Sequence, residues 1–140
     1  MPKMTAAELV SFIDAAFPEH EHDFLVEEVT AERLRLRLAI QPAHLRPGNT
    51  IAGPVLMMLA DTAMLLMVIS RIGPEAAVVT SSLSINFLRK PPEADLIAEA
   101  RPLKIGRRLA VGDIRIYSDG ETEAVAQATV TYAIPGPPGA

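Results

Sequence analysis

An acidic residue interrupts a long apolar run, residues 55–69, and this combination constrains the fold more than any other feature of the chain. The acid, Asp61, lies near the centre of the run. If the run is a helix, the positions three and four residues from Asp61 are methionines and a leucine, so no cation on that helix can pair with the carboxylate. An unpaired buried carboxylate is costly. Asp61 must therefore be held by hydrogen bonds from other elements or be retained for chemistry.

The run must also be distinguished from a membrane span. It is shorter than the roughly 20 apolar residues that a bilayer requires. It carries Asp61 at its centre and is soon followed by Arg71. We therefore expect a core helix that is covered by protein on every side, with no membrane partner.

Most of the remaining chain has strand-like patterns. Residues 31–40 alternate strictly between leucine or isoleucine on one face and arginine on the other, which predicts a strand with one dry and one wet face. Further strands are predicted over residues 78–88, 95–103, 108–118 and 121–134. The dipeptide Asp119-Gly120 favours a tight hairpin turn between the last two. A peripheral amphipathic helix is predicted over residues 5–17.

This order of elements predicts an α+β fold: a helix, a strand pair, the buried helix and at least four strands in antiparallel succession. A curved antiparallel sheet with one dry face can wrap around the single apolar helix. We expect one domain over residues 1–134 and a flexible Pro- and Gly-rich tail over residues 135–140. A single sheet of this kind leaves open edges, and the joining of two copies would cover them, so we expect a homodimer.

Composition narrows the function. The 140 residues include 17 acidic and 13 basic ones, and the basic ones form no long run, which argues against nucleic acid as a partner. The chain has no Cys, so it can form neither a disulfide nor a thiolate site. The start of the sequence reads as a polar helix rather than a signal peptide, and we expect a cytoplasmic protein.

Three segments carry a resemblance to a known family. The segment from His44 through Arg46, Gly53 and Asp61 to Ala63 resembles the start of the central helix in hotdog-fold acyl-CoA thioesterases of the PaaI-like, phenylacetate-pathway type. Residues 84–89 (Ser-Ile-Asn-Phe-Leu-Arg) resemble the strand that follows, and residues 105–107 (Ile-Gly-Arg) resemble a later turn. The resemblance extends over residues 31–132.

The resemblance implies a hotdog fold, in which a curved antiparallel sheet wraps around one long buried helix. It further implies that two subunits form one continuous sheet, with active sites at the dimer interface, and a dimer of dimers remains an alternative. The implied substrate is a small-molecule acyl-CoA. Coenzyme A is then part of the substrate, and neither a separate cofactor nor a metal is expected.

The family motif is only partly kept. Its pattern has Asn, then His-Gly-Gly six residues later, then an acid nine residues after the His. This spacing aligns the acid with Asp61 and the first Gly with Gly53, but it aligns the Asn with Arg46, the His with Ala52 and the second Gly with Pro54. Pro is compatible with a first helical turn, so the helix start is preserved.

The resemblance gives these residues roles. Asp61 would attack the thioester carbonyl or activate water, and the Gly53 N–H would hold the oxyanion, with Arg46 nearby. From the residues themselves, hydroxyls that could orient the acid or a water are those of Thr80, Ser81, Ser82 and Ser84, of which we favour Ser81 or Ser82. Each residue also has a structural interpretation: Asp61 as a carboxylate held by hydroxyls, and Gly53 as part of an ordinary helix start.

Substrate contacts are predicted in two groups. The residues expected to contact the substrate, without an assigned part of it, are His44, Asn49, Pro54, Met58, Asn86 and Phe87. The cations expected at the phosphates of coenzyme A are Arg89, Lys90, Lys104, Arg107 and Arg108. Charged strand ends are often simply solvated, and a methionine such as Met58 is often plain core.

The resulting function is hydrolysis of an acyl-CoA to free acid and coenzyme A. An acyl-CoA-binding or acyl-ligand-binding protein with little or no activity is the alternative that Ala52 and Arg46 favour. A hydratase or dehydratase is a third alternative, which would require a His such as His44 to act with the acid. These residues do not define the acyl group.

Overall fold

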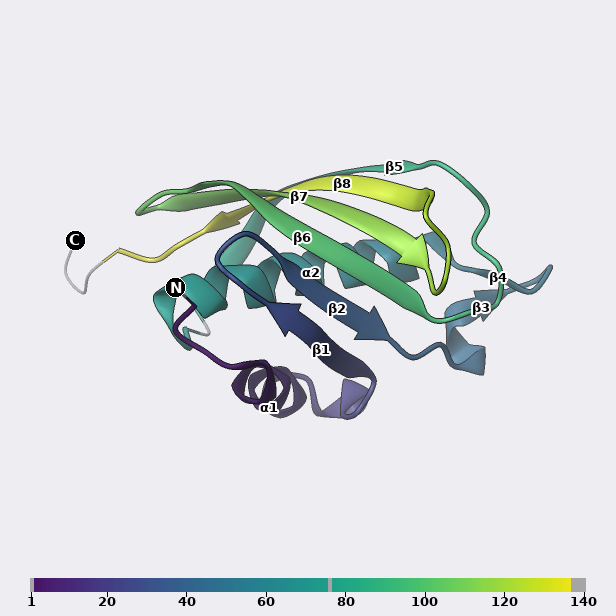
Figure 1. Cartoon of the computed structure of the whole chain (residues 1–140), viewed down its shortest axis with the longest axis horizontal. Coiled ribbons are helices and arrows are strands. Elements are labelled where there is room, and N and C mark those ends of the chain that lie inside the picture. The colour runs from purple at the N-terminus through teal and green to yellow at the C-terminus, as the bar shows by residue number, and fades with distance from the viewer. Residues whose placement is uncertain (1, 76, 137–140) are drawn as a thin grey trace.

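The structure, a computed structural model, describes residues 2–75 and 77–136. A curved six-stranded antiparallel sheet covers the long helix α2 (Gly53–Ile72), and a shorter helix, α1 (Ala6–Ala16), packs beside strand β1 (Figure 1). This arrangement confirms the expected α+β hotdog fold.

The sheet is not built in chain order. Its strands lie in the order β1 (Phe24–Val29), β2 (Leu34–Leu38), β6 (Leu96–Ile105), β7 (Leu109–Ser118), β8 (Ala124–Ala133) and β5 (Val79–Phe87). A separate two-stranded ladder joins β3 (Leu45–Arg46) and β4 (Thr50–Ile51), and short 3-10 helices span Pro18–His20 and Pro42–His44. The chain thus crosses the sheet between β5 and β6.

Helix α2 is the centre of the core. It begins two residues before the predicted start because Gly53 and Pro54 fit the first turn, and it ends at Ile72, followed by the cap residue Gly73 with a φ of 96°. Its length and hydropathy match those of a membrane span. Most of its length from Leu56 to Ser70 is nevertheless buried inside the protein, as expected from the sequence.

The charged face of the sheet is solvated. Arg37 on β2 donates from Nε to Glu27 at 2.6 Å and from its other nitrogens to Asp95 and Asp119, each at 3.2 Å. Arg35 also bonds Glu27, at 3.0 Å. The opposite face of β2 is fully buried against the core. The predicted division of this strand into a wet and a dry face is confirmed.

Several predicted boundaries were wrong. The strand predicted over residues 31–40 is limited to Leu34–Leu38, because the Thr30 hydroxyl accepts the Arg33 N–H and closes a turn before it. Asp119-Gly120 does not form a two-residue hairpin. A turn closes from Ser118 to Glu121 with Gly120 at φ 82°, but β8 resumes only at Ala124.

The crossover leaves β5 at an edge. β5 pairs with β8 and not with its successor β6, so its other side carries unpaired backbone groups. Its side chains are mostly exposed, and two large apolar ones at its ends are more than half exposed: Val79 at 58% and Phe87 at 53%. Exposed edges of this kind favour pairing with another strand.

Part of the predicted tail can be described. Pro135 and Gly136 follow β8 without forming a strand or helix. Residues 137–140 lie outside the described residues.

The contact between β7 and α2 yields a test of the core. A Cβ atom at Gly112 would lie 2.6 Å from Met64 Sδ, 2.8 Å from Met67 Cε and 3.3 Å from the Arg101 carbonyl oxygen. We expect Gly112→Val to lower the free energy of unfolding by about 1–3 kcal/mol through overpacking. Urea denaturation measures the change, with Thr122→Val on the exposed β7–β8 connection as the control. Equal stability of the two variants would contradict this packing.

Candidate active site

Asp61 is held by hydroxyl groups from the sheet. Thr80 Oγ1 on β5 donates to Asp61 Oδ1 at 2.6 Å, and the Tyr132 hydroxyl on β8 lies 3.0 Å from the same oxygen. The Tyr132 hydroxyl also lies 3.2 Å from the Asp61 carbonyl oxygen. Among the described residues, the hydrogen bonds to this carboxylate all go to Oδ1, so Oδ2 is available to a ligand.

Tyr132 is the most buried of these polar groups. Its side chain is 3% exposed, and burial raises the pKa of the phenol well above its usual value. The neighbouring Asp61 carboxylate acts in the same direction, because a negative charge disfavours the phenolate. Tyr132 therefore stays protonated and remains a hydrogen-bond donor to Asp61.

Sequence reasoning identified the acid but not both of its partners. Of the candidate hydroxyls on β5 it favoured Ser81 or Ser82, both of which are exposed, whereas the hydroxyl that contacts Asp61 is that of the less favoured candidate, Thr80. A bulge between Thr80 and Ser82 shifts the register there. Tyr132 is 71 residues away from Asp61 in the chain, so only the pairing of β8 with β5 reveals it.

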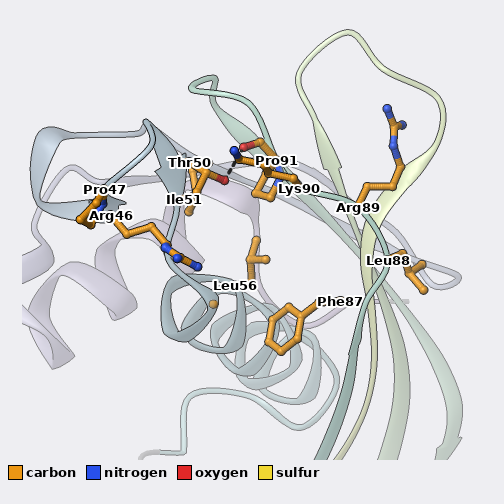
Figure 2. Close-up of a pocket in the computed structure, with 11 residues that line it drawn as sticks. Arg46, Pro47, Thr50, Ile51, Leu56, Phe87, Leu88, Arg89, Lys90 and Pro91 are labelled. Atoms are coloured by element: carbon orange, nitrogen blue, oxygen red, sulfur yellow. Dashed lines mark hydrogen bonds between the residues drawn. The ribbon is translucent and has the colours of Figure 1, made fainter.

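The start of α2 opens onto a separate pocket of about 610 Å³ (Figure 2). Gly53 lies in its wall, and the Phe87 ring is 3.5 Å from the position that a Cβ on Gly53 would occupy. Ala52 offers no side-chain cap, and Pro54 has no N–H. The first N–H groups of a helix lack intrahelical partners, so the Gly53 N–H is a donor suited to an anionic oxygen.

Three cations line this pocket. Arg46 extends toward the start of α2, whereas Arg89 points away from it (Figure 2). Arg89 pairs with Glu123 at 3.2 Å. Lys90 lies opposite Gly48, with its Nζ 4.0 Å from the position that a Cβ on Gly48 would occupy. The pocket combines positive charge with the free end of a helix, an arrangement suited to phosphate.

The segment before α2 is fixed by its own turn. The His44 imidazole is buried, and its Nδ1 accepts the Gln41 N–H at 3.0 Å, which gives this side chain a structural role. Asn49 adopts a left-handed conformation with a φ of 55°. Thr50 Oγ1 donates to the Pro91 carbonyl at 2.8 Å, as the dashed line in Figure 2 marks. These bonds hold the Arg46 turn beside the segment that contains Lys90.

The other predicted residues are dispersed. Asn86 bonds Gln127 on β8 at 3.2 Å, and Met58 is half-buried on α2. Lys104, Arg107 and Arg108 lie exposed around the β6–β7 turn. That turn is at the end of the sheet where β5 begins, because Leu109 and Val79 both pair with Ala133. The β5 strand separates these cations from Arg89 and Lys90 by about 25 Å.

Asp61 and Gly53 do not meet within one chain. They lie eight positions apart on α2, which is about 12 Å along the helix axis. Gly53 lines the cationic pocket, whereas Asp61 lines another pocket of about 290 Å³ beside α1. Within residues 2–75 and 77–136, no three His, Asp or Glu side chains are placed to hold a metal ion.

The Tyr132 environment predicts a titration. The pKa of Tyr132 in the folded protein is above the unfolded value of about 10. The buried, protonated phenol therefore contributes fully to the stability of the fold below about pH 10, and this contribution is lost as the pH rises through the folded pKa. Tyr117→Phe leaves Tyr132 as the single tyrosine. We expect its absorbance at 295 nm to show less than half ionisation at pH 11 while circular dichroism shows a folded protein. A mostly ionised tyrosine in the folded state would contradict this environment.

Comparisons with known proteins agree with this fold. The sequence model of the thioesterase superfamily matches residues 48–125. The solved structure of a candidate thioesterase from Silicibacter sp. TM1040 is 38% identical, has a TM-score of 0.90, and aligns over 97% of this chain and 95% of its own.

Two further structures extend the similarity. A variant of the phenylacetic acid degradation protein PaaI from Thermus thermophilus is 25% identical with a TM-score of 0.70, and the match covers 83% of this chain and 97% of that one. Zebrafish thioesterase superfamily member 2 is 18% identical with a TM-score of 0.81, over 94% and 99% of the two chains. Among curated proteins, none matches the sequence. The chain therefore belongs to the thioesterase superfamily, as a PaaI-like member with the hotdog fold.

Proposed function

We propose that this protein hydrolyses acyl-CoA thioesters at two sites that are shared between the subunits of a homodimer. The observation that carries the proposal is that Asp61 and Gly53 lie near opposite ends of the same edge strand, β5, whose outer side is unpaired. Asp61 contacts Thr80 at the start of β5, and Gly53 lies beside Phe87 at its end.

The position of β5 at the edge of the sheet would allow two subunits to pair through this strand. If two copies of β5 pair antiparallel about a two-fold axis, the start of one strand lies beside the end of the other. Asp61 of one subunit would then face Gly53 of the second subunit. The same pairing would extend the sheet across both subunits and cover the apolar side chains of Val79 and Phe87.

The chemistry follows from these two groups. Asp61 Oδ2 either attacks the carbonyl carbon, giving an anhydride that water then opens, or removes a proton from a water that attacks. In both routes the carbonyl oxygen becomes an oxyanion, and the Gly53 N–H of the second subunit stabilises it. The carbon–sulfur bond then breaks, coenzyme A leaves as the thiol after protonation, and the free acid remains.

Positive charge supports coenzyme A as the leaving group. The Gly53 pocket is lined by Arg46 and Lys90, whose charges suit the phosphates of a nucleotide, while Arg89 at its rim is paired with Glu123. Antiparallel pairing of β5 would also bring Lys104 and Arg108 of the second copy to the same end of the sheet. The cations that are dispersed in one chain would then form one group around each site.

The departures from the family motif are compatible with this scheme. Ala52 replaces a polar side chain, but the backbone donor of the next residue, Gly53, is unchanged. Arg46 replaces a short amide with a cation that extends toward that donor (Figure 2). A protein that binds acyl-CoA without hydrolysing it is the alternative that these two residues favour.

Replacement of Asp61 tests the activity. We expect Asp61→Asn to retain the fold and to lower kcat on acyl-CoA substrates by about 100-fold or more, because the amide is neither a base nor a nucleophile at this position. Thiol release from a panel of acyl-CoAs measures the rate. The control is Asp113→Asn on the solvated face of β7, which should leave kcat unchanged.

The outcomes separate the two alternatives. Turnover by the wild type that is lost only in Asp61→Asn supports hydrolysis with Asp61 as the reacting group. Tight acyl-CoA binding with no turnover of any acyl-CoA by the wild type would overturn hydrolysis and favour the binding protein.

A further inference from the structure

The two hydroxyl groups that bond Asp61 differ in their access to water. Thr80 is exposed at the start of β5, so water can replace its bond to Asp61 Oδ1. Tyr132 is only 3% exposed, and its hydroxyl therefore depends on acceptors within the protein. Of the two bonds to the carboxylate, the one from Tyr132 is the more persistent.

The Tyr132 hydroxyl has two acceptors on the same residue. Asp61 Oδ1 lies 3.0 Å away, and the Asp61 carbonyl oxygen lies 3.2 Å away. Within α2 this carbonyl also accepts the N–H four residues later, and its second lone pair can accept the phenol. A phenol has one proton, so it can make a full hydrogen bond to one of these oxygens at a time.

The charge of Asp61 decides which acceptor the hydroxyl prefers. A carboxylate oxygen is a stronger acceptor than a carbonyl, so the hydroxyl bonds Oδ1 while Asp61 is charged. The charge is lost when Oδ2 takes a proton from water or forms a bond to the acyl carbon. The hydroxyl can then turn to the Asp61 carbonyl, and the buried phenol keeps a hydrogen bond in both states.

Among the described residues, the other groups that face this pair carry no charge. The residues of α1 and β5 that line the pocket beside Asp61 are Phe12, Ala16, Phe17, Val78, Val79 and Thr80. On β7 the residue paired with Tyr132 is Ala110. In the proposed dimer, cations of the second subunit would approach Oδ2 equally in the wild type and in variants at Tyr132. A difference between such proteins therefore reports on the hydroxyl.

We propose that Tyr132 is a positioning residue for the reaction: its hydroxyl holds Asp61 Oδ1 while the acid is charged, turns to the Asp61 carbonyl when the charge is lost, and so keeps Oδ2 free and charged for the substrate. The inference rests on the proposed function and adds a residue that acts through the acid. Burial, together with the neighbouring carboxylate, raises the pKa of the phenol, so the hydroxyl retains the proton that this role requires.

Titration of the Asp61 carboxyl group tests this role without substrate. In protein labelled with ¹³C at the aspartate side-chain carboxyl carbons, the Asp61 resonance is identified by its absence from Asp61→Asn. We expect Tyr132→Phe to raise the midpoint of this titration by about one pH unit, because a hydrogen bond to a charged group changes proton affinity by about tenfold. Circular dichroism checks that the variant is folded.

Tyr117→Phe is the matched control. Tyr117 is the other tyrosine of the sequence, and it lies about 23 Å along β7 from Ala110, the residue that pairs with Tyr132. We expect its replacement to leave the midpoint unchanged. A midpoint that is unchanged or lowered in Tyr132→Phe, or raised equally in both variants, would overturn the inference.

A second measurement leaves the hydroxyl at position 132 in place. Fluorotyrosine incorporated into Tyr117→Phe labels position 132 alone. We expect its ¹⁹F resonance to change with the same midpoint as the Asp61 carboxyl carbon, and we expect Asp61→Asn in the same background to abolish the change. A resonance that does not follow the ionisation of Asp61 would contradict the exchange of acceptors.

Hydrolysis rates supply the functional arm. The acid limb of the pH profile of kcat/KM should move upward in Tyr132→Phe by the same interval as the carboxyl titration, whereas Tyr117→Phe should leave it in place. Turnover by the wild type with no shift of the titration or of the limb in Tyr132→Phe would contradict the role of Tyr132 alone. A shifted titration in a protein that hydrolyses no acyl-CoA would contradict the thioesterase function alone.

Discussion

Burial of α2 is the constraint on which the rest of the structure depends. A helix that is apolar on nearly every side must be covered, and the chain covers it with a curved sheet and with α1. After α2, a crossover places β5 at the far edge of the sheet, beside β8, and not beside its neighbours in the chain. The same crossover brings the Thr80 and Tyr132 hydroxyls to Asp61, so within the described part of the chain the carboxylate is held by hydroxyl donors and not by a cation.

The position of Asp61 also limits what one chain can do. The free helix start at Gly53 and the carboxylate face two different pockets, one cationic and one apolar. Neither pocket alone contains an acid, an oxyanion donor and sites for both halves of a thioester. The proposed pairing of β5 strands would join each apolar pocket to the cationic pocket of the other subunit, which explains why both features lie along one exposed edge.

The sequence was sufficient for the fold but not for the geometry around the acid. Periodicity and the apolar run predicted the central helix, the half-solvated strand β2 and the antiparallel sheet, because these depend on local patterns of polarity. The order of strands was not predictable in this way, since β5 pairs with the last strand and not with the next. Tyr132 was missed for this reason. Thr80 was among the candidate hydroxyls but was ranked below its neighbours, because a bulge that the sequence pattern does not reveal sets which hydroxyl faces Asp61.

The shared site is the central claim, and complementation between two inactive variants tests it most directly. Asp61→Asn and Gly53→Leu would each be inactive alone, since every site would lack either the acid or an accessible donor. When the two are co-expressed and pair at random, each mixed dimer has one intact site, so we expect about a quarter of the wild-type activity to return. Mixed dimers that form but show no activity would contradict a site shared between subunits.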